Sequence, residues 1–265
     1  MAVTFSPSIS ETELSTIRAL FISPHLDDVA LSCAGTLCRH LAEGDPCLVA
    51  TVFTEMSEPV SEYAREFNRE CGLGVDDTHL LWQLRRQEDR DAAAVLNTPF
   101  VWLGFVDAIY RGYHSDAELF GVPKPEDRIV AERIAATLVG LWEKTCAAVV
   151  YLPLAIGEHV DHQLCAGLGM TLVAAGAHVV FYEDYPYAEH PGALARRLDG
   201  STLQRRAVDI TPHVSRRIEA VDCYRTQVGY LFPVRRPDDA IREFARSRSS
   251  QPGCFGEVVY EDVPR

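Results

Sequence analysis

Short apolar runs alternate along this chain with stretches whose apolar residues recur at helical spacing. The apolar runs, which predict buried strands, cover residues 18–23, 47–54, 100–105, 147–152 and 178–182. The helical patterns cover residues 29–43, two polar-rich segments that begin at 62 and 83, and residues 131–142 and 162–175. Strands that alternate with helices are typical of a mostly parallel sheet covered on both faces. The pattern predicts a Rossmann-like α/β fold with three layers, α/β/α.

The alternation of predicted strands and helices ends after residue 185. Residues 195–210 are polar and contain arginines, a helical pattern runs from about 212 to 227, and a tail rich in Pro, Arg and Ser follows. No internal repeat or clear linker divides the chain. We therefore expect a single domain over residues 1–265, with an α/β core over 1–185 and a smaller C-terminal cap and tail over 186–265.

Composition narrows the class of protein. Apolar residues make up 47% and charged residues 24% of the 265 residues, which is typical of a globular protein of enzyme size. The net charge of -13 disfavours nucleic acid and anionic membranes as partners. No apolar run approaches the roughly 18 residues of a membrane span, and the N-terminus lacks the features of a signal peptide. We expect a cytoplasmic protein with no membrane span and no nucleic-acid partner.

The cysteines favour the same compartment. They are dispersed and form no C-x-x-C pair, which predicts free thiols in a reducing environment rather than a disulfide framework. They occupy positions 33, 38, 47, 71, 146, 165, 223 and 254.

The first candidate for chemistry is the sequence PHLDD at residues 24–28, where the first predicted strand meets the first predicted helix. Ligands of open α/β sheets bind outside the carboxyl ends of the strands, so His25, Asp27 and Asp28 stand at a favourable place. Taken alone, paired aspartates before a helix are more often an N-cap.

The second candidate is HVDH at residues 159–162, which follows the predicted strand 147–152. The two loops lie at the same edge of one sheet, so three carboxylates and three imidazoles can share a cleft. Catalytic zinc sites use three nitrogen or oxygen ligands and leave one position open, and two His with one Asp fit that pattern. A lone loop histidine is more often a hydrogen-bonded bystander.

Together the two motifs resemble those of the LmbE/PIG-L family of zinc-dependent N-acetylglucosaminyl deacetylases. PHLDDVALSCAGTL is similar to the family signature (A/P)HPDDE, and GEHVDH is similar to its HPDH motif. The likeness extends to RRQED at residues 85–89, to LGFVD ending at Asp107, and more faintly to CYRTQ at 223–227. It covers most of the first 165 residues.

The resemblance implies a metal site and a base. His25, Asp28 and His162 would hold one zinc ion per chain, although a site with two His and one Asp also accepts Fe²⁺ or Co²⁺. Asp27 would be the general base that takes a proton from the attacking water and later protonates the leaving amine.

The resemblance also implies residues that contact substrate. His159, in its protonated form, would stabilise the oxyanion of the tetrahedral intermediate, and Asp161 would support that charge by accepting a ring N–H. Arg85 and Asp107 would contact substrate hydroxyl or phosphate groups. We add Arg111, from the aromatic and polar stretch after Asp107, as a candidate for sugar or anion binding.

The sequence departs from the family pattern at several positions. Leu26 and Val160 replace the two motif prolines, Val29 stands where a glutamate is usual, and Tyr224 stands where His is frequent. Gly157 and Glu158 precede His159, where some members carry an aromatic residue that can reach the substrate. These departures concern substrate preference more than the reaction.

We therefore expect a metal-dependent hydrolase that removes an N-acyl group, an N-acetyl group above all, from a small molecule containing an amino sugar, with a homo-oligomer possible. One alternative is a carbohydrate-binding module that retains the metal without turnover, but Asp27 argues against it, since binding needs no base. A Rossmann dehydrogenase would share the strand and helix rhythm, but no G-x-G-x-x-G follows the first strand.

A local basic cluster lies in the acidic tail. Its members are Arg235, Arg236, Arg242, Arg246 and Arg248. A solvated helix face, paired with Asp238, Asp239 and Glu243, is the favoured interpretation, and a lid that recognises phosphate is the alternative.

Overall fold

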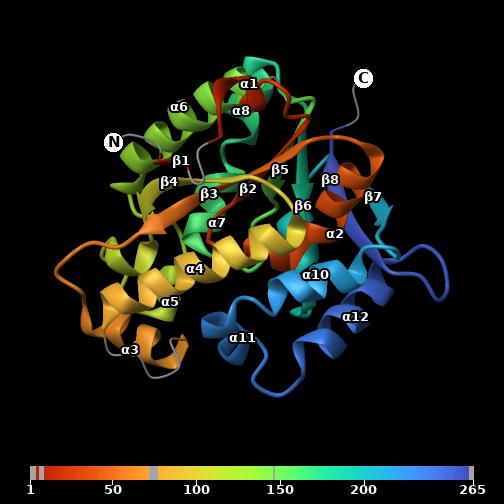
Figure 1. Cartoon of the computed structure of the whole chain (residues 1–265). Coiled ribbons are helices and arrows are strands. Elements are labelled where there is room, and N and C mark those ends of the chain that lie inside the picture. The colour runs from red at the N-terminus through yellow and green to blue at the C-terminus, as the bar shows by residue number, and fades with distance from the viewer. Residues whose placement is uncertain (1–3, 6–8, 72–76, 146, 263–265) are drawn as a thin grey trace.

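The computed structural model describes residues 4–5, 9–71, 77–145 and 147–262, which build one twisted sheet with helices on both faces (Figure 1). Within these residues the sheet has eight strands in the order β1-β4-β3-β2-β5-β6-β8-β7. Their bounds are β1 Thr4–Phe5, β2 Ala19–Ser23, β3 Cys47–Glu55, β4 Phe100–Val106, β5 Val149–Pro153, β6 Val179–Tyr182, β7 Gln204–Asp209 and β8 Gly256–Glu261. The predicted α/β class with a mostly parallel sheet is confirmed.

The helices follow most of the predicted pattern. Their bounds are α1 Glu11–Leu14, α2 Asp28–Glu43, α3 Glu62–Cys71, α4 Thr78–Leu96, α5 Asp116–Leu119, α6 Asp127–Thr145, α7 Val160–Ala166, α8 Gly169–Ala175, α9 Ala193–Leu198, α10 Val214–Val221, α11 Arg225–Leu231 and α12 Pro237–Arg248, with 3₁₀ turns η1 Ala108–Tyr110 and η2 Tyr187–Glu189. Two predicted helices are each divided in two. The pattern 162–175 breaks at Gly167, and the pattern 212–227 breaks between α10 and α11.

The strand order places a crevice between β2 and β5. Strands β4, β3, β2, β5 and β6 run parallel, and β1, β8 and β7 are antiparallel additions at the two edges. From β2 the chain first builds the sheet outward through β3 and β4, and it then returns to the other side of β2 with β5. The carboxyl ends of β2 and β5 therefore flank the switch point where open α/β sheets bind ligands.

Each face of the sheet has its own hydrophobic core. Alternate residues of β2 point to opposite faces, so Ala19 and Phe21 pack with α2, α4, α10 and α12, whereas Leu20 and Ile22 pack with α1, α6, α7 and α8. Both faces are visible in Figure 1 as helix layers above and below the sheet. This double coverage explains why the central strands are continuous apolar runs rather than alternating ones.

The C-terminal part of the chain does more than the expected cap. Besides α9 to α12, it supplies β7 and β8, which pair with each other and extend the sheet beyond β6. The sequence QRRAVD of β7 lacks the apolar run of a buried strand, because its first three residues are polar and lie exposed on the sheet edge. The strand β8 has the apolar residues Val258, Val259 and Tyr260, but they lie in the segment that its Pro, Arg and Ser content predicts to be a tail.

Strand β8 also caps a break inside α2. Cys33 has non-helical dihedral angles, which leaves the N–H groups that follow it without their usual helical acceptors. The Glu257 carboxylate accepts hydrogen bonds from Gly35 N at 2.9 Å and from Thr36 N at 2.7 Å, and it lies 3.2 Å from Arg217 Nη1. Both charged side chains are buried. This contact fixes the helix that begins with Asp28.

We expect Glu257→Gln to lower the free energy of unfolding by about 3 kcal/mol or more, because it leaves the Arg217 guanidinium buried without a counter-charge. Chemical denaturation followed by circular dichroism measures the change. The control is Glu261→Gln in the same strand, whose ion pair with Arg206 is partly exposed and should contribute less than about 1 kcal/mol. Equal effects of the two substitutions would contradict this account of Glu257.

The structure also bears on the predicted free thiols and on the predicted absence of a membrane span. The cysteines within the described residues are free thiols, and Cys146 lies outside them. Among the helices of the described residues, none is long and apolar enough to cross a membrane.

The basic cluster of the tail forms two of the expected ion pairs, since Arg242 lies 2.5 Å from Asp238 and Arg235 lies 3.4 Å from Glu243. Two of its arginines also reach carboxylates outside the tail. Arg235 lies 2.5 Å from Glu189 of η2, and Arg248 lies 2.5 Å from Glu183, which follows β6.

Candidate active site

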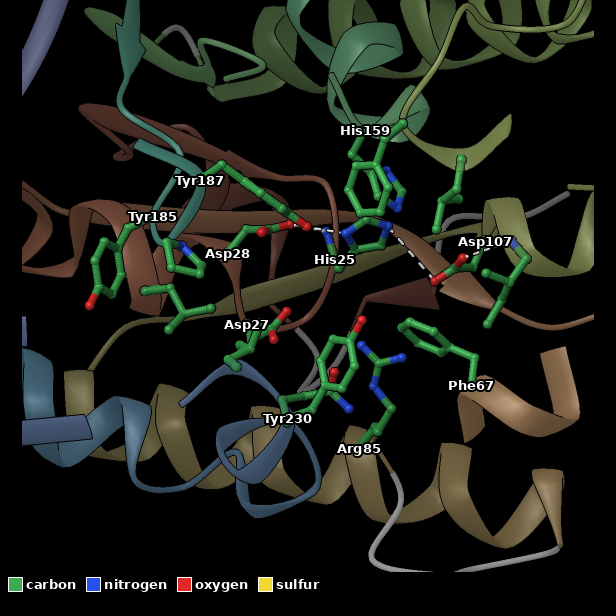
Figure 2. Close-up of a pocket in the computed structure, with 17 residues that line it drawn as sticks. His25, Asp27, Asp28, Phe67, Arg85, Asp107, His159, Tyr185, Tyr187 and Tyr230 are labelled. Carbon is green, nitrogen blue, oxygen red and sulfur yellow. Dashed lines mark hydrogen bonds and ion pairs between the residues drawn. The ribbon is translucent and has the colours of Figure 1, made fainter. Parts of the chain in front are cut away.

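The two sequence motifs meet in one cavity at the carboxyl ends of β2 and β5 (Figure 2). Its polar lining consists of His25, Asp27, Asp28, Arg85, Asp107, His159 and Gln227. Its apolar and aromatic lining includes Leu31, Phe67, Ile109, Phe120, Tyr187 and Tyr230.

The turn that carries His25 is held without the motif proline. The His25 backbone N–H donates to Asp28 Oδ2 at 2.7 Å. The Ser23 hydroxyl donates to His25 O at 2.5 Å and accepts from Val29 N at 3.1 Å. These bonds tie the end of β2 to the start of α2, so Leu26 does not loosen the turn.

His25, Asp28 and His162 converge as the family resemblance implies. Asp28 Oδ2 lies 3.2 Å from His25 Nδ1 and 3.3 Å from His162 Nε2, and the candidate ligand atoms of the three residues lie within 4.8 Å of one another. His162 is 1% exposed, yet its Nε2 has no hydrogen-bond partner. A buried nitrogen lone pair directed at a carboxylate and a second imidazole fits a divalent cation.

Both histidines have a carboxylate behind them. His162 Nδ1 lies 2.6 Å from Asp184 Oδ1, and His25 Nε2 lies 3.1 Å from Asp161 Oδ2. When these nitrogens carry the protons, the opposite ring nitrogens are free to bind a metal. Asp184 was not among the residues expected from the sequence, although it follows β6 at the carboxyl edge and the strand-end rule would have found it.

The three residues form a buried cluster of opposite charges. Burial disfavours a charged His162, but Asp28 and Asp184 raise its pKa to about 9. Burial likewise opposes ionisation of Asp28, but His162 and His25 hold the pKa of its carboxyl well below the usual value. A cation would replace protons here, as expected of a metal site built from ionisable ligands.

A second group of potential ligands, His25, His159 and Asp161, is less suited to a metal. Asp161 Oδ1 lies 2.7 Å from Arg111 Nη2, and Asp161 Oδ2 accepts the Ala108 N–H at 3.0 Å. The negative charge of Asp161 is therefore already neutralised by Arg111, which leaves less of it to attract a cation.

The expected partnership between His159 and the Asp161 carboxylate is wrong. His159 Nδ1 instead accepts the backbone N–H of Asp161 at 3.2 Å, while the carboxylate faces His25 and Arg111. Burial, and next the charge of His25, hold the pKa of His159 well below its usual value. This shift favours the neutral ring, and in the neutral ring the acceptor role of Nδ1 places the proton on Nε2.

Asp27 lies at the N-cap position of α2 but does not act as a cap, because its side chain makes no capping hydrogen bond. The carboxylate instead lines the cavity beside the three candidate ligands and is 7% exposed. Burial, and next the charge of Asp28, raise its pKa. A raised pKa suits a carboxylate that must take up and return a proton.

Arg85 and Asp107 line the cavity, whereas Arg111 does not. Arg85 Nε is buried without a hydrogen-bond partner, and Asp107 Oδ2 lies 3.8 Å from His25 Nε2. The Arg111 guanidinium is engaged by Asp161 and by Asp127, whose Oδ1 lies 3.1 Å from Nε. Arg111 therefore holds Asp161 behind His25, which the sequence could not reveal because these three residues lie far apart in the chain.

Tyr187 is an unforeseen part of the lining. Its ring packs over Gly157, where a Cβ atom would lie 2.6 Å from Tyr187 Cγ, and its centroid is 5.7 Å from that of His162. The glycine that departs from the family pattern is thus what admits this aromatic ring from η2.

The RRQED segment contributes Arg85 to the cavity and holds α11 in place through Glu88 and Asp89. Glu88 accepts hydrogen bonds from Thr226 N at 2.9 Å and Thr226 Oγ1 at 2.6 Å, at the start of α11. The Tyr224 hydroxyl donates to Asp89 Oδ1 at 2.8 Å, and burial raises the pKa of Asp89 to about 7. Tyr224 is therefore a buried anchor of α11, which brings Gln227 to the cavity.

Comparison with known proteins agrees with this geometry. Residues 20–173 match the family model "PIG-L: GlcNAc-PI de-N-acetylase". Two 2'-N-acetylparomamine deacetylases are similar in sequence. The one from Niallia circulans is 35% identical over 80% of this chain and 82% of its own, and the one from Streptomyces fradiae is 32% identical over 86% and 77%. The zinc-inhibited form of teicoplanin deacetylase is similar in structure, with a TM-score of 0.77 and 26% identity over 92% of this chain and 97% of that one.

Proposed function

This chain belongs to the PIG-L family, and on that premise we propose that it hydrolyses the N-acetyl amide of an amino-sugar-containing small molecule with the help of one bound divalent cation. The observation that carries the proposal is the convergence of His25, Asp28 and His162, with Asp27 free beside them. Zinc suits the donor set, and Fe²⁺ or Co²⁺ are also compatible with it.

When bound, the cation would acidify a water molecule and polarise the amide carbonyl. His25, Asp28 and His162 would hold it, and Asp161 and Asp184 would orient the two imidazole rings through hydrogen bonds. Buried and freely directed into the cavity, Asp27 takes the proton from the attacking water. It then returns this proton to the nitrogen of the departing amine.

His159 assists as a neutral hydrogen-bond donor. Its Nδ1 accepts the Asp161 N–H, so the proton resides on Nε2, which can donate to the carbonyl oxygen as negative charge develops there. Arg85 and Asp107 bind polar groups of the sugar. The unpaired Nε of Arg85 and the Asp107 carboxylate offer a donor and an acceptor for hydroxyl groups.

Hydrolysis accounts for the site better than the two rival functions. A module that only binds sugar would have no use for a buried carboxylate of raised pKa next to the metal ligands. A dehydrogenase needs a glycine-rich turn after β2, where this chain has PHLDD. The two curated relatives act on 2'-N-acetylparomamine, which agrees with an N-acetylated amino sugar as substrate.

Acetate release tests the proposal. The protein, loaded in parallel with equimolar Zn²⁺, Co²⁺ or Fe²⁺, is incubated with 2'-N-acetylparomamine, and acetate and free amine are measured. Release of both in equal amounts with at least one metal is expected, and excess zinc should be tested separately because a structural relative has a zinc-inhibited form. Binding without release under every metal would favour the module that only binds sugar.

We expect Asp184→Asn to weaken metal binding by about 10- to 100-fold while leaving the fold intact. An amide in place of this carboxylate no longer holds the charge and orientation of His162. Competition with a fluorescent chelator measures the affinity. Asp209→Asn is the control, since its exposed carboxylate accepts the Thr211 N–H at 2.9 Å and does not line the cavity. A similar loss of affinity there would contradict the role of Asp184.

A further inference from the structure

One wall of the cavity is built by two aromatic rings that the reaction itself does not use. Phe67 of α3 and Tyr230 of α11 line the cavity, and their rings meet nearly edge to face with centroids 5.5 Å apart. Figure 2 draws both rings on the side of the cavity opposite His159. Paired aromatic faces of this kind are suited to contact a ring of the ligand.

The pair lies at the outer part of the cavity. Tyr230 is 43% exposed, whereas Asp28 and His159 at the reacting centre are each 6% exposed. A substituent that extends from the reacting sugar towards solvent therefore passes along these rings.

The position of Tyr230 is fixed by buried contacts. Glu88 of α4 binds both polar groups of Thr226 at the start of α11, and Asp89 accepts the Tyr224 hydroxyl just before it. These contacts make α11 a rigid support, as required of a surface that selects a ligand.

Two carboxylates lie on the α3 side of the pair. Glu70 follows Phe67 by three residues in α3, so the two side chains are neighbours on one helix face. Burial raises the pKa of the Tyr230 hydroxyl, and Asp116 and Glu70 are among the neighbours that raise it further. Asp116 is exposed and accepts the Tyr63 hydroxyl at 2.7 Å. An aromatic face flanked by carboxylates attracts a cation.

We propose that Phe67 and Tyr230, with Asp116 and Glu70 beside them, form an outer subsite for a second, amine-bearing ring joined to the N-acetylated sugar. This inference rests on the proposed function and adds the class of substrate to it. The second ring stacks on the aromatic pair, and its ammonium groups lie towards the two carboxylates.

Three substrates and two variants of Tyr230 test the stacking. The substrates are 2'-N-acetylparomamine, which has a second ring with amines, N,N'-diacetylchitobiose, whose second ring is uncharged, and N-acetylglucosamine, which has one ring. Tyr230→Ala should raise KM for 2'-N-acetylparomamine about 3- to 10-fold at unchanged kcat, raise it less for N,N'-diacetylchitobiose, and leave N-acetylglucosamine unaffected. Tyr230→Phe keeps the ring and should behave as the unmodified protein.

Asp116→Asn tests the charge separately, since the amide oxygen can still accept the Tyr63 hydroxyl. It should raise KM for 2'-N-acetylparomamine about twofold at low salt, lose this effect at high salt, and leave N,N'-diacetylchitobiose unchanged. The same change for the charged and the uncharged substrate would overturn the electrostatic part of the subsite.

Two outcomes separate the subsite from the proposed function. A rise in KM for N-acetylglucosamine as large as that for 2'-N-acetylparomamine in Tyr230→Ala would overturn the subsite while leaving deacetylation intact. If the unmodified protein releases acetate from none of the three substrates, the proposed function fails. Calorimetric binding of paromamine then decides the subsite, which requires 3- to 10-fold weaker binding by Tyr230→Ala than by the unmodified protein.

Discussion

Asp27→Asn is expected to lower kcat by about 10²-fold or more while the metal content and the fold stay as they are. The amide has the size of the carboxylate but cannot accept the proton of the attacking water. Asp27 makes no capping hydrogen bond to α2, so the substitution removes no helix cap. Acetate release under saturating substrate measures the effect, and elemental analysis gives the metal content.

A matched measurement separates the base from a ligand. Asp28→Asn, one residue further, removes the carboxylate oxygen that lies between His25 and His162, so it should lose the metal together with the activity. A fall in metal content in Asp27→Asn as large as that in Asp28→Asn would make Asp27 a ligand, and another residue would then have to serve as base.

His162→Ala is expected to abolish stoichiometric metal binding and, with it, detectable deacetylation. The substitution removes the buried Nε2 that has no hydrogen-bond partner and leaves only His25 and Asp28 of the three ligands. It also leaves Asp184 buried next to an empty space, so a lower unfolding temperature is expected. Elemental analysis after dialysis measures the metal bound per chain.

The control for His162→Ala is His178→Ala. His178 lies before β6, its side chain is 54% exposed, and its ion pair with Glu261 lies away from the cavity. This variant should keep one metal per chain and full activity. Full metal retention by His162→Ala would remove His162 from the ligand set and favour the group of His25, His159 and Asp161.

The α/β class and the position of the site along the chain can both be predicted from the amino-acid sequence. Both follow from local signals. Apolar runs and helical periodicity report burial within a few residues, and a motif directly after a strand must lie at the carboxyl edge of a parallel sheet. For this reason the residues around His25 and His162 can be assigned to one cleft from the sequence alone.

The groups that support the site became known only from the folded chain. Arg111 was expected to meet substrate but binds Asp161 behind His25, and Asp184 was not foreseen behind His162. In the same way β7 and β8 were hidden in an apparent tail, although Glu257 of β8 reaches back to Gly35 in the middle of α2. These contacts join residues that are distant in the chain, and a buried polar group takes whichever partner the fold brings within hydrogen-bond distance, which no local pattern of residues encodes.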